Sequence, residues 1–229
     1  VDGQIYSDWI YHAPVKSRCI FEYIYFARTD SIIDGQSVYS SRVRAGSILA
    51  EKYPVDADLV IGVPESGLAA AVGYSQGSNI PYGMAFYKNS YVGRTFIKPK
   101  QNERTAGVQA KLNVIRDVVK GKRVVMVDDS IVRGTTIRNI VKMLKDAGAL
   151  EVHVRISSPP FKHPCYYGTD VPSSENLVAV NNTIDEIKES INADSLGFLD
   201  IEDLGQLCPG LDYCDACFTG KYAGGIPSD

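Results

Sequence analysis

The strongest constraint on the fold lies in residues 124–136, where an apolar run leads into two adjacent carboxylates and then a turn rich in hydroxyl groups. Residues 123–127 are an unbroken apolar run bounded by charged and turn residues, a pattern typical of a central strand in a parallel sheet. Ligands of open α/β sheets bind outside the carboxyl ends of the strands, which is where Asp128 and Asp129 fall. The segment therefore predicts a ligand site at a sheet edge.

The residues after the carboxylates suit a phosphate group. A helix is predicted after Thr136, because Ile137, Ile140, Val141 and Leu144 recur at helical spacing before Gly148. An anion at the start of this helix meets unpaired N–H groups and the positive end of the dipole. Small and hydroxyl-bearing residues surround that position: Ser130, Gly134, Thr135 and Thr136. The two carboxylates can accept hydrogen bonds from sugar hydroxyls, and the start of the helix can bind a phosphate. Together they predict a site for a phosphorylated ribose. The alternative is a solvated strand end with Thr135 as an ordinary helix cap.

A second phosphate-facing motif, Val-Pro-Glu-Ser-Gly at residues 63–67, ends the predicted strand 59–63. Its small residues allow backbone N–H groups to approach a pyrophosphate, and the Ser66 hydroxyl is an oxygen ligand that suits magnesium. Glu65, Ser66 and Gly67 are therefore candidate substrate-binding residues. Taken alone, the motif is better explained as an ordinary strand-to-helix turn. Together with the Asp128 segment, it predicts the second wall of a diphosphate site.

The remaining pattern predicts an α/β fold with a doubly wound, mostly parallel sheet. We expect helices at 36–52, 68–75 and 183–191, the last with a Thr183–Glu186 capping box, and strands at 82–86, 114–119 (paired with 123–127) and 151–157. The sheet pattern is expected to end at Pro159, and the tail 206–229 to be irregular. The basic segment 87–111 is too long for a plain connection and is interpreted as an active-site lid.

Composition limits the function classes. With 229 residues and 45% hydrophobic content the chain can build a proper core, and its net charge of −3 argues against a nucleic-acid-binding surface. No apolar run approaches the length of a membrane span, and no signal-peptide pattern opens the chain. We therefore expect a cytoplasmic protein with no membrane or nucleic-acid partner.

Five cysteines are an odd number for a disulfide framework in a reducing compartment, so a metal site is the better interpretation. Cys214-x-x-Cys217 is a common metal-binding hairpin that needs two further ligands. Spacing alone leaves zinc and an iron–sulfur cluster open, with inert buried thiols as the alternative for Cys19 or Cys165 taken singly.

Residues 124–136 resemble the phosphoribosyl pyrophosphate loop of type I phosphoribosyltransferases at nearly every position. Further segments extend the resemblance to the phosphoribosyltransferase part of the amidophosphoribosyltransferase family: residues 19–31, 35–46, 60–67, 91–113 and 213–222. The resemblance implies a type I phosphoribosyltransferase fold and transfer of phosphoribose from phosphoribosyl pyrophosphate to ammonia. The products are 5-phosphoribosylamine and pyrophosphate, in the first committed step of purine biosynthesis. It also implies Mg²⁺, inhibition by purine nucleotides and a homo-oligomer.

The resemblance assigns roles to individual residues. Asp128 and Asp129 hold the ribose hydroxyls and the magnesium shell, which Ser66 shares. The 5-phosphate lies among Ser130, Arg133, Gly134, Thr135 and Thr136. The lid residues Arg94, Lys98 and Lys111 cover the pyrophosphate.

One branch of the family carries a [4Fe–4S] cluster, and its ligand segments match Cys19, Cys165, Cys214 and Cys217, leaving Cys208 over. We thus expect one domain over residues 1–229 with a cluster-binding C-terminal segment at about 159–229. The N-terminal glutaminase domain of the family has no counterpart in this sequence, so the chain is interpreted as the synthase half of a longer precursor.

Two rival functions stay open. One is a nucleobase salvage phosphoribosyltransferase, which shares the Asp128 segment. The other is a non-catalytic nucleotide-binding regulator that kept the fold; the presence of both Asp128 and Asp129 argues against it.

Overall fold

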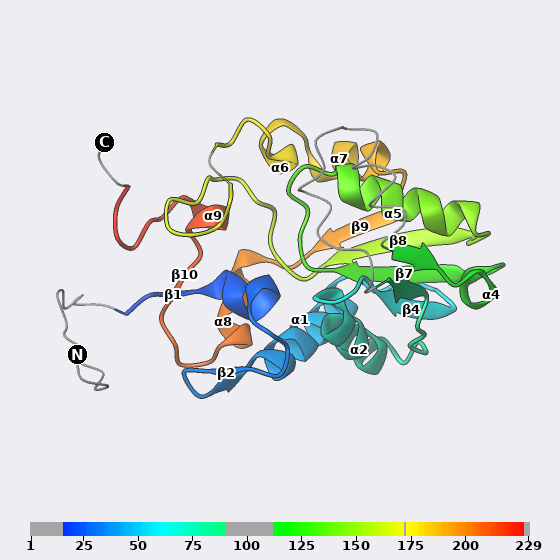
Figure 1. The fold of residues 1–229 in the computed structure, drawn as a ribbon, viewed down its shortest axis with the longest axis horizontal. Helices are drawn as coiled ribbons and strands as arrows, with labels where there is room; N and C mark the ends of the chain where they lie inside the picture. Colours follow the sequence, from blue (N-terminus) through cyan, green and yellow to red (C-terminus); the bar gives the residue numbers. More distant parts are fainter. Residues whose placement is uncertain (1–15, 90–111, 172, 227–229) are drawn as a thin grey trace, which may run out of the picture.

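The computed structural model describes residues 16–89, 112–171 and 173–226. At its centre is a four-stranded parallel sheet (Figure 1) in the order β4 (Leu59–Gly62), β7 (Arg123–Asp128), β8 (Glu151–Ile156) and β9 (Ser195–Phe198). Gly62 pairs with Val127, and Asp128 pairs with Ile156. The loops that follow β4, β7 and β8 therefore leave the sheet at the same edge.

Helices cover both faces of this sheet (Figure 1), as the doubly wound pattern predicts. Alternate strand residues point to opposite faces: Val60, Val125 and Val127 join one core, whereas Ile61 and Met126 join the other. The first core lies against α1 (Val38–Lys52) and α2 (Gly67–Ser78), and the second against α5 (Thr135–Asp146) and α7 (Ile184–Ser190).

Helices α1 and α2 pack closely because glycine stands at their crossing. A Cβ atom at Gly46 would lie 1.8 Å from the Ala70 carbonyl oxygen, and one at Gly73 would lie 1.9 Å from that of Val43. Only glycine permits this approach, which fixes α2 and the loop before it against the sheet.

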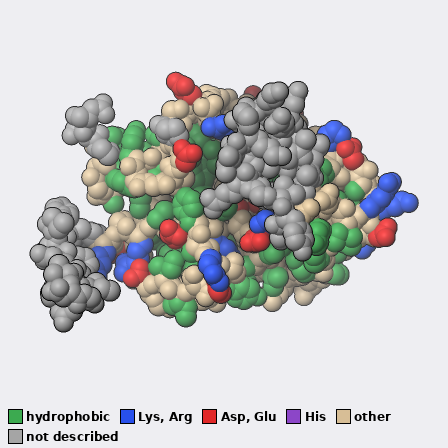
Figure 2. Space-filling model, in the orientation of Figure 1, with side chains coloured by type: hydrophobic (Ala, Val, Ile, Leu, Met, Phe, Trp, Pro, Cys, Tyr) green, Lys and Arg blue, Asp and Glu red, His purple; other side chains and the backbone are tan. Residues whose placement is uncertain are grey.

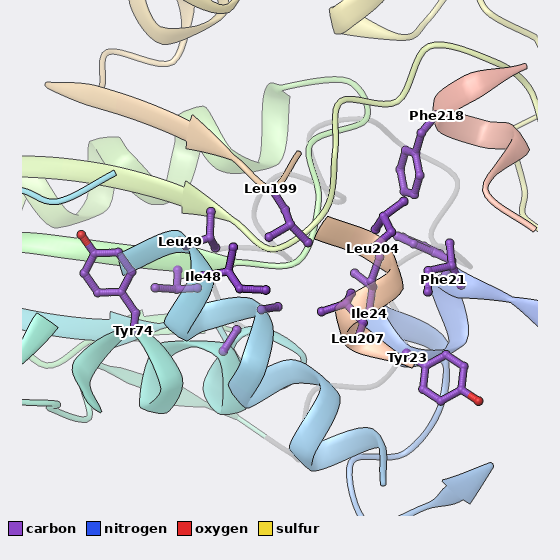
Figure 3. Close-up of a cluster of buried hydrophobic side chains, with 14 of the residues drawn as sticks. Phe21, Tyr23, Ile24, Ile48, Leu49, Tyr74, Leu199, Leu204, Leu207 and Phe218 are labelled. Carbon is purple, nitrogen blue, oxygen red and sulfur yellow. The ribbon is translucent and has the colours of Figure 1, made fainter. Parts of the chain in front are cut away.

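Segments from both ends of the chain complete the first core (Figure 3). Phe21 and Ile24 come from η1 (Glu22–Phe26) and the residue before it, and they lie beside Leu204 and Leu207 of α8 (Leu204–Leu207). Phe218 of α9 (Ala216–Thr219) packs edge to face on Phe161 at a centroid distance of 5.0 Å. These described segments near the two ends of the chain, together with the loop 159–171, lie over the carboxyl edge of the sheet and are called the hood below.

The remaining elements are short. They are β1 (Arg18–Cys19), β2 (Ile32–Ile33), β3 (Gln36–Ser37), β5 (Phe86–Lys88), β6 (Leu112–Val114), α4 (Arg116–Val119), α6 (Val178–Asn181), η3 (Ile201–Asp203) and β10 (Tyr213–Cys214). Strands β5 and β6 pair antiparallel on either side of residues 90–111. Residues 90–111 make up most of the expected lid and lie outside the described residues.

Three predicted elements were wrong. The expected strand 114–119 instead contains the last residue of β6 and the helical turn α4. Ile115 and Val119 stand four residues apart, which suits a helical turn. Strand β6 pairs with β5 and not with β7. The expected strand 82–86 makes only a single bridge, from Tyr82 to Val60, before β5 begins at Phe86. The sheet does not end at Pro159, because β9 joins it beyond β8.

Other predictions were confirmed. The capping box at Thr183 is present, with the Thr183 N–H donating to Glu186 at 2.7 Å. The tail is largely irregular but contains β10 and α9. Among the described residues, no helix has the length and apolar character to span a membrane. On the face shown in Figure 2, acidic and basic side chains are interspersed.

Candidate active site

A cavity of about 590 Å³ opens where β7 meets α5. Its sheet-side wall contains most of the predicted phosphoribose residues: Ser66, Asp128, Asp129, Ser130, Arg133, Gly134, Thr135 and Thr136. The rest of the lining comes from the hood and includes Phe21, Phe26, Phe161 and residues 169–171. The structure thus gathers two sequence-distant motifs on one wall and adds a second wall that the sequence analysis did not predict.

The two carboxylates are buried, with exposed fractions of 9% for Asp128 and 8% for Asp129. Asp128 Oδ1 accepts the Asp129 N–H at 2.9 Å, and the Ser130 hydroxyl donates to Asp129 Oδ1 at 2.5 Å. The Ser66 hydroxyl donates to the other oxygen of Asp129, so the loop after β4 meets the loop after β7 at this carboxylate.

Burial raises the pKa of Asp128 well above its usual range, and repulsion from Asp129 adds to the rise. Burial also raises the pKa of Asp129, although the Ser130 and Ser66 hydroxyls and the Arg42 charge oppose it. None of the ion pairs within the described parts of the chain involves either carboxylate. Two adjacent buried carboxylates without a cationic partner form a site that favours a bound cation.

The start of α5 is arranged for an anion. Gly134 is the residue before the helix and has a φ of +78°, which allows the loop to turn sharply into the 12-residue helix. No side chain caps the helix, so its first N–H groups face the cavity without a side-chain acceptor. Thr135 is the first helical residue and not the cap, contrary to the alternative interpretation of the sequence.

The loop after β4 separates the three residues predicted from its motif. Ser66 lines the cavity, and Gly67 lies behind it, where a Cβ atom would come 2.5 Å from the Val127 carbonyl oxygen. Glu65 follows a cis peptide bond, turns away and pairs with Lys88 at 3.1 Å. It lines a neighbouring cavity of about 990 Å³ that also contains Ser66.

The lid residues Arg94, Lys98 and Lys111 lie outside the described residues. The aromatic residues Phe21, Tyr25 and Phe26 of the hood line the cavity, yet sequence reasoning assigned them no role despite their place in a resembling segment. Asp170 also lines the cavity, and no motif or spacing in the sequence pointed to it.

A second cavity, of about 570 Å³, is lined by Cys19, Cys165, Cys214 and Cys217. The parallel pair β1–β10 sets Cys19 directly beside Cys214, although they are separated by almost the whole chain. All five cysteines are free thiols, and Cys208 is buried in the first core, away from this cavity. The four thiols singled out in the sequence therefore share one cavity, and the fifth does not.

Electrostatics make two of these thiols, Cys19 and Cys217, hard to ionise without a cation. Burial raises the pKa of Cys217, and the neighbouring thiols of Cys19, Cys165 and Cys214 raise it further. Burial also raises the pKa of Cys19. The pKa of Cys165 is lowered: burial raises it, but backbone hydrogen bonds from residues 167–169 outweigh that effect. In the described residues, no three or more His, Cys, Asp or Glu side chains are arranged to hold a single metal ion.

With this geometry in hand, comparison with known proteins decides the family. Residues 37–166 match the family model of the phosphoribosyl transferase domain. The chain belongs to the phosphoribosyl transferase domain family. The match includes β4, β7 and both loops that meet at Asp129, and it confirms the predicted type I phosphoribosyltransferase fold.

Curated relatives narrow the position within the phosphoribosyl transferases. The chain is 54% identical to an amidophosphoribosyltransferase from Synechocystis sp., over 93% of this chain and 43% of the relative. It is 51% identical to the amidophosphoribosyltransferase of Archaeoglobus fulgidus, over 100% of this chain and 51% of the relative. The chain therefore spans about half the length of the curated relatives it matches.

Solved structures agree. The glutamine phosphoribosylpyrophosphate amidotransferase from B. subtilis, complexed with ADP and GMP, superposes with a TM-score of 0.83 at 53% identity, over 91% of this chain and 47% of that chain. A structure described as the allosteric regulatory enzyme of purine biosynthesis superposes with a TM-score of 0.85 at 53% identity, over 93% of this chain and 47% of that chain.

Proposed function

We propose that this chain transfers phosphoribose from phosphoribosyl pyrophosphate to ammonia, forming 5-phosphoribosylamine and pyrophosphate as in the first committed step of purine biosynthesis. The observation that carries the proposal is the meeting of Ser66, the buried Asp128–Asp129 pair and the uncapped start of α5 in one cavity. Identity of about half to amidophosphoribosyltransferases over nearly the whole chain supports ammonia as the acceptor.

In this proposal the 5-phosphate binds at the start of α5, among Ser130, Arg133, Gly134, Thr135 and Thr136. Asp128 and Asp129 accept hydrogen bonds from the ribose hydroxyls. The pyrophosphate lies toward Ser66 and the loop 63–67, in which Gly67 permits the close packing behind Ser66 and Glu65 faces the neighbouring cavity. Arg94, Lys98 and Lys111 are the proposed cover of the pyrophosphate. The hood excludes water, which otherwise competes with ammonia for the ribose carbon.

The donors fit a magnesium ion. Asp128, Asp129 and Ser66 present hard oxygen ligands, and the two carboxylates lack a cationic partner among the described residues. Bound there, Mg²⁺ would neutralise the charge that collects on the leaving pyrophosphate. The protein's own contribution is to hold the carboxylates in place through the Ser66 and Ser130 hydroxyls and the Asp129 N–H, so no reorganisation is needed as the charge develops.

We propose that Cys19, Cys165, Cys214 and Cys217 hold a [4Fe–4S] cluster. The four thiols line one cavity, and the resemblance of their segments to the cluster-bearing branch of the family supports a cluster over a single zinc ion. Such a group would be structural, because it joins the β1–β10 pair to the loop at Cys165 and so fixes the hood. Iron and sulfide analysis of anaerobically purified protein tests this assignment.

The transfer is tested by measuring pyrophosphate release from phosphoribosyl pyrophosphate with ammonium, and with adenine, hypoxanthine and uracil as rival acceptors. The proposal expects release with ammonium alone. Substituting both Asp128→Asn and Asp129→Asn should lower the rate by about a hundredfold or more while the circular dichroism spectrum is unchanged. Turnover with a nucleobase would assign the chain to salvage instead, and normal ammonia-dependent turnover in the double variant would refute the site.

Ammonia is the direct nucleophile in this proposal, and glutamine hydrolysis belongs to a glutaminase domain of the full-length precursor. Purine nucleotides are proposed as inhibitors that compete for the same cavity, and a homo-oligomer as the assembled form. The B. subtilis structure complexed with ADP and GMP supports nucleotide binding by such proteins.

A further inference from the structure

One acidic side chain of the substrate cavity has no part in the proposed phosphoribose site. Asp170 lines the same cavity as Asp128 and Asp129. The residue is exposed, and within the described parts of the chain its carboxylate makes no ion pair or side-chain hydrogen bond. It is therefore available to a ligand.

The carboxylate is held in position by its neighbours. The Cys165 N–H donates to the Val171 carbonyl oxygen at 2.9 Å, and the Val171 N–H donates to that of Thr169 at 2.7 Å. The Thr169 N–H also donates to Cys165 Sγ at 3.4 Å. Val171 is 6% exposed and belongs to the first core. Asp170 thus stands between two anchored residues, on a turn that is closed by backbone hydrogen bonds.

Its charge is out of place for a residue that contacts phosphate. The cavity is built for an anionic substrate, and an unpaired carboxylate beside a phosphate would weaken binding. The proposed magnesium site at Asp128 and Asp129 already offers a place for a metal. Phe21, Phe26 and Phe161 line the same cavity and offer the carboxylate no charged partner. A carboxylate in such a place is suited to a small partner that donates hydrogen bonds and becomes positive during the reaction.

We propose that Asp170 binds the incoming ammonia and stabilises the positive charge that forms on its nitrogen; the inference rests on the proposed function. The ammonia N–H donates to the carboxylate, which leaves the nitrogen lone pair free. That lone pair forms the bond to the ribose carbon, and the electrons of the breaking carbon–oxygen bond leave with pyrophosphate. The nitrogen, now a positive ammonium group, is paired with Asp170 until it releases a proton to water.

The test uses the Asp170→Asn and Asp170→Ala variants of the anaerobically purified chain, with kcat and KM measured separately for ammonia and for phosphoribosyl pyrophosphate. Glu175→Gln is the matched control, because it removes one exposed carboxylate nearby that does not line the cavity. We expect kcat/KM for ammonia to fall about a hundredfold in both Asp170 variants. The KM for phosphoribosyl pyrophosphate and the Mg²⁺ concentration for half-maximal rate should stay within about twofold, and Glu175→Gln should match the unsubstituted chain.

The outcomes separate this inference from the function on which it rests. If the unsubstituted chain binds Mg²⁺–pyrophosphate but shows no ammonia-dependent turnover, the proposed function fails. If it turns over and Asp170→Asn has an unchanged kcat/KM for ammonia, the inference alone is refuted. A rise confined to the KM for phosphoribosyl pyrophosphate would make Asp170 a ribose contact, and a weakened Mg²⁺ dependence would make it a metal ligand; either result overturns the ammonia role.

Discussion

Replacing Asp128 with asparagine should make the metal-free protein more stable while it removes activity. In the native chain two carboxylates with exposed fractions below 10% lie next to each other without a cationic partner among the described residues. Because the pKa of each is raised in the folded state, their effect on stability is favourable below the unfolded-state pKa of about 4 and is lost as the pH rises through the folded-state pKa. At neutral pH the pair therefore destabilises the fold.

The magnitude follows from linkage. Each unit by which the folded-state pKa exceeds the unfolded-state value removes about 1.4 kcal/mol at neutral pH. Asparagine at position 128 keeps the oxygen that accepts the Asp129 N–H, so the loop geometry can survive the change. We expect the free energy of unfolding to rise by about 1–2 kcal/mol, a usual size for a single stabilising substitution. For a chain of this size that is a rise of about 2–8 °C in thermal midpoint.

The assay is the thermal midpoint at pH 7.5 in EDTA and in excess Mg²⁺, on anaerobic samples of equal iron content. The native chain should gain stability from Mg²⁺, whereas Asp128→Asn should start higher and gain little. Asp129→Asn is the comparison, because Asp129 accepts two hydroxyl hydrogen bonds and its loss offsets the relief of repulsion. A lower midpoint for Asp128→Asn in EDTA, or an Mg²⁺ response equal to that of the native chain, would refute the interpretation of the pair as a cation site.

Three further predictions concern other parts of the structure. Gly67→Ala should lower the free energy of unfolding by about 1–3 kcal/mol and weaken pyrophosphate binding, because the added Cβ atom would lie 2.5 Å from backbone. Denaturant titration should show no such loss of stability for the control Gly205→Ala, whose Cβ atom would have its nearest contact at 3.7 Å. Cys214→Ser should abolish bound iron and sulfide, whereas Cys208→Ala should keep both and lose only packing stability, and the reverse pattern would contradict the ligand set. Burial lowers the pKa of His153 in the folded state, so stability should fall as the pH drops below about 6.5 and through the folded-state pKa; thermal midpoints from pH 8 to 5 should show a smaller fall in His153→Gln.

Local signals explain why the sheet-side wall could be predicted from the sequence. The strand, both carboxylates and the start of α5 lie within 14 consecutive residues, 123 to 136, so short-range preferences determine their arrangement. The parallel pairing of the two apolar strands β4 and β7 then places Ser66 beside Asp129. Predicting this contact requires only that the two strands pair in parallel.

The errors arose where long-range contacts decide the structure. Residues 114–119, four of which are apolar, suit either a strand or a helical turn, and only the pairing of β6 with β5 excludes the strand. Strand β9 is four residues long and gains its place from β8, which no local pattern indicates. Asp170 lies on a turn closed by its own backbone, so its position in the cavity has no signature in the sequence.

The two walls of the substrate cavity also differ in what holds them. The sheet-side wall rests on β4 and β7, whose inward residues Val60, Val125 and Met126 are fully buried. The hood wall is formed by segments near both ends of the chain, joined by the two-residue pair β1–β10 and by the contacts of Phe21 and Phe218 with Phe161. A two-residue strand pair contributes little by itself, so the position of the hood depends on the aromatic packing and, if the proposed cluster binds, on its four thiols. In the proposed function, phosphate recognition would then belong to the part of the fold that the sheet stabilises, whereas exclusion of water and placement of Asp170 would belong to the part that the cluster stabilises.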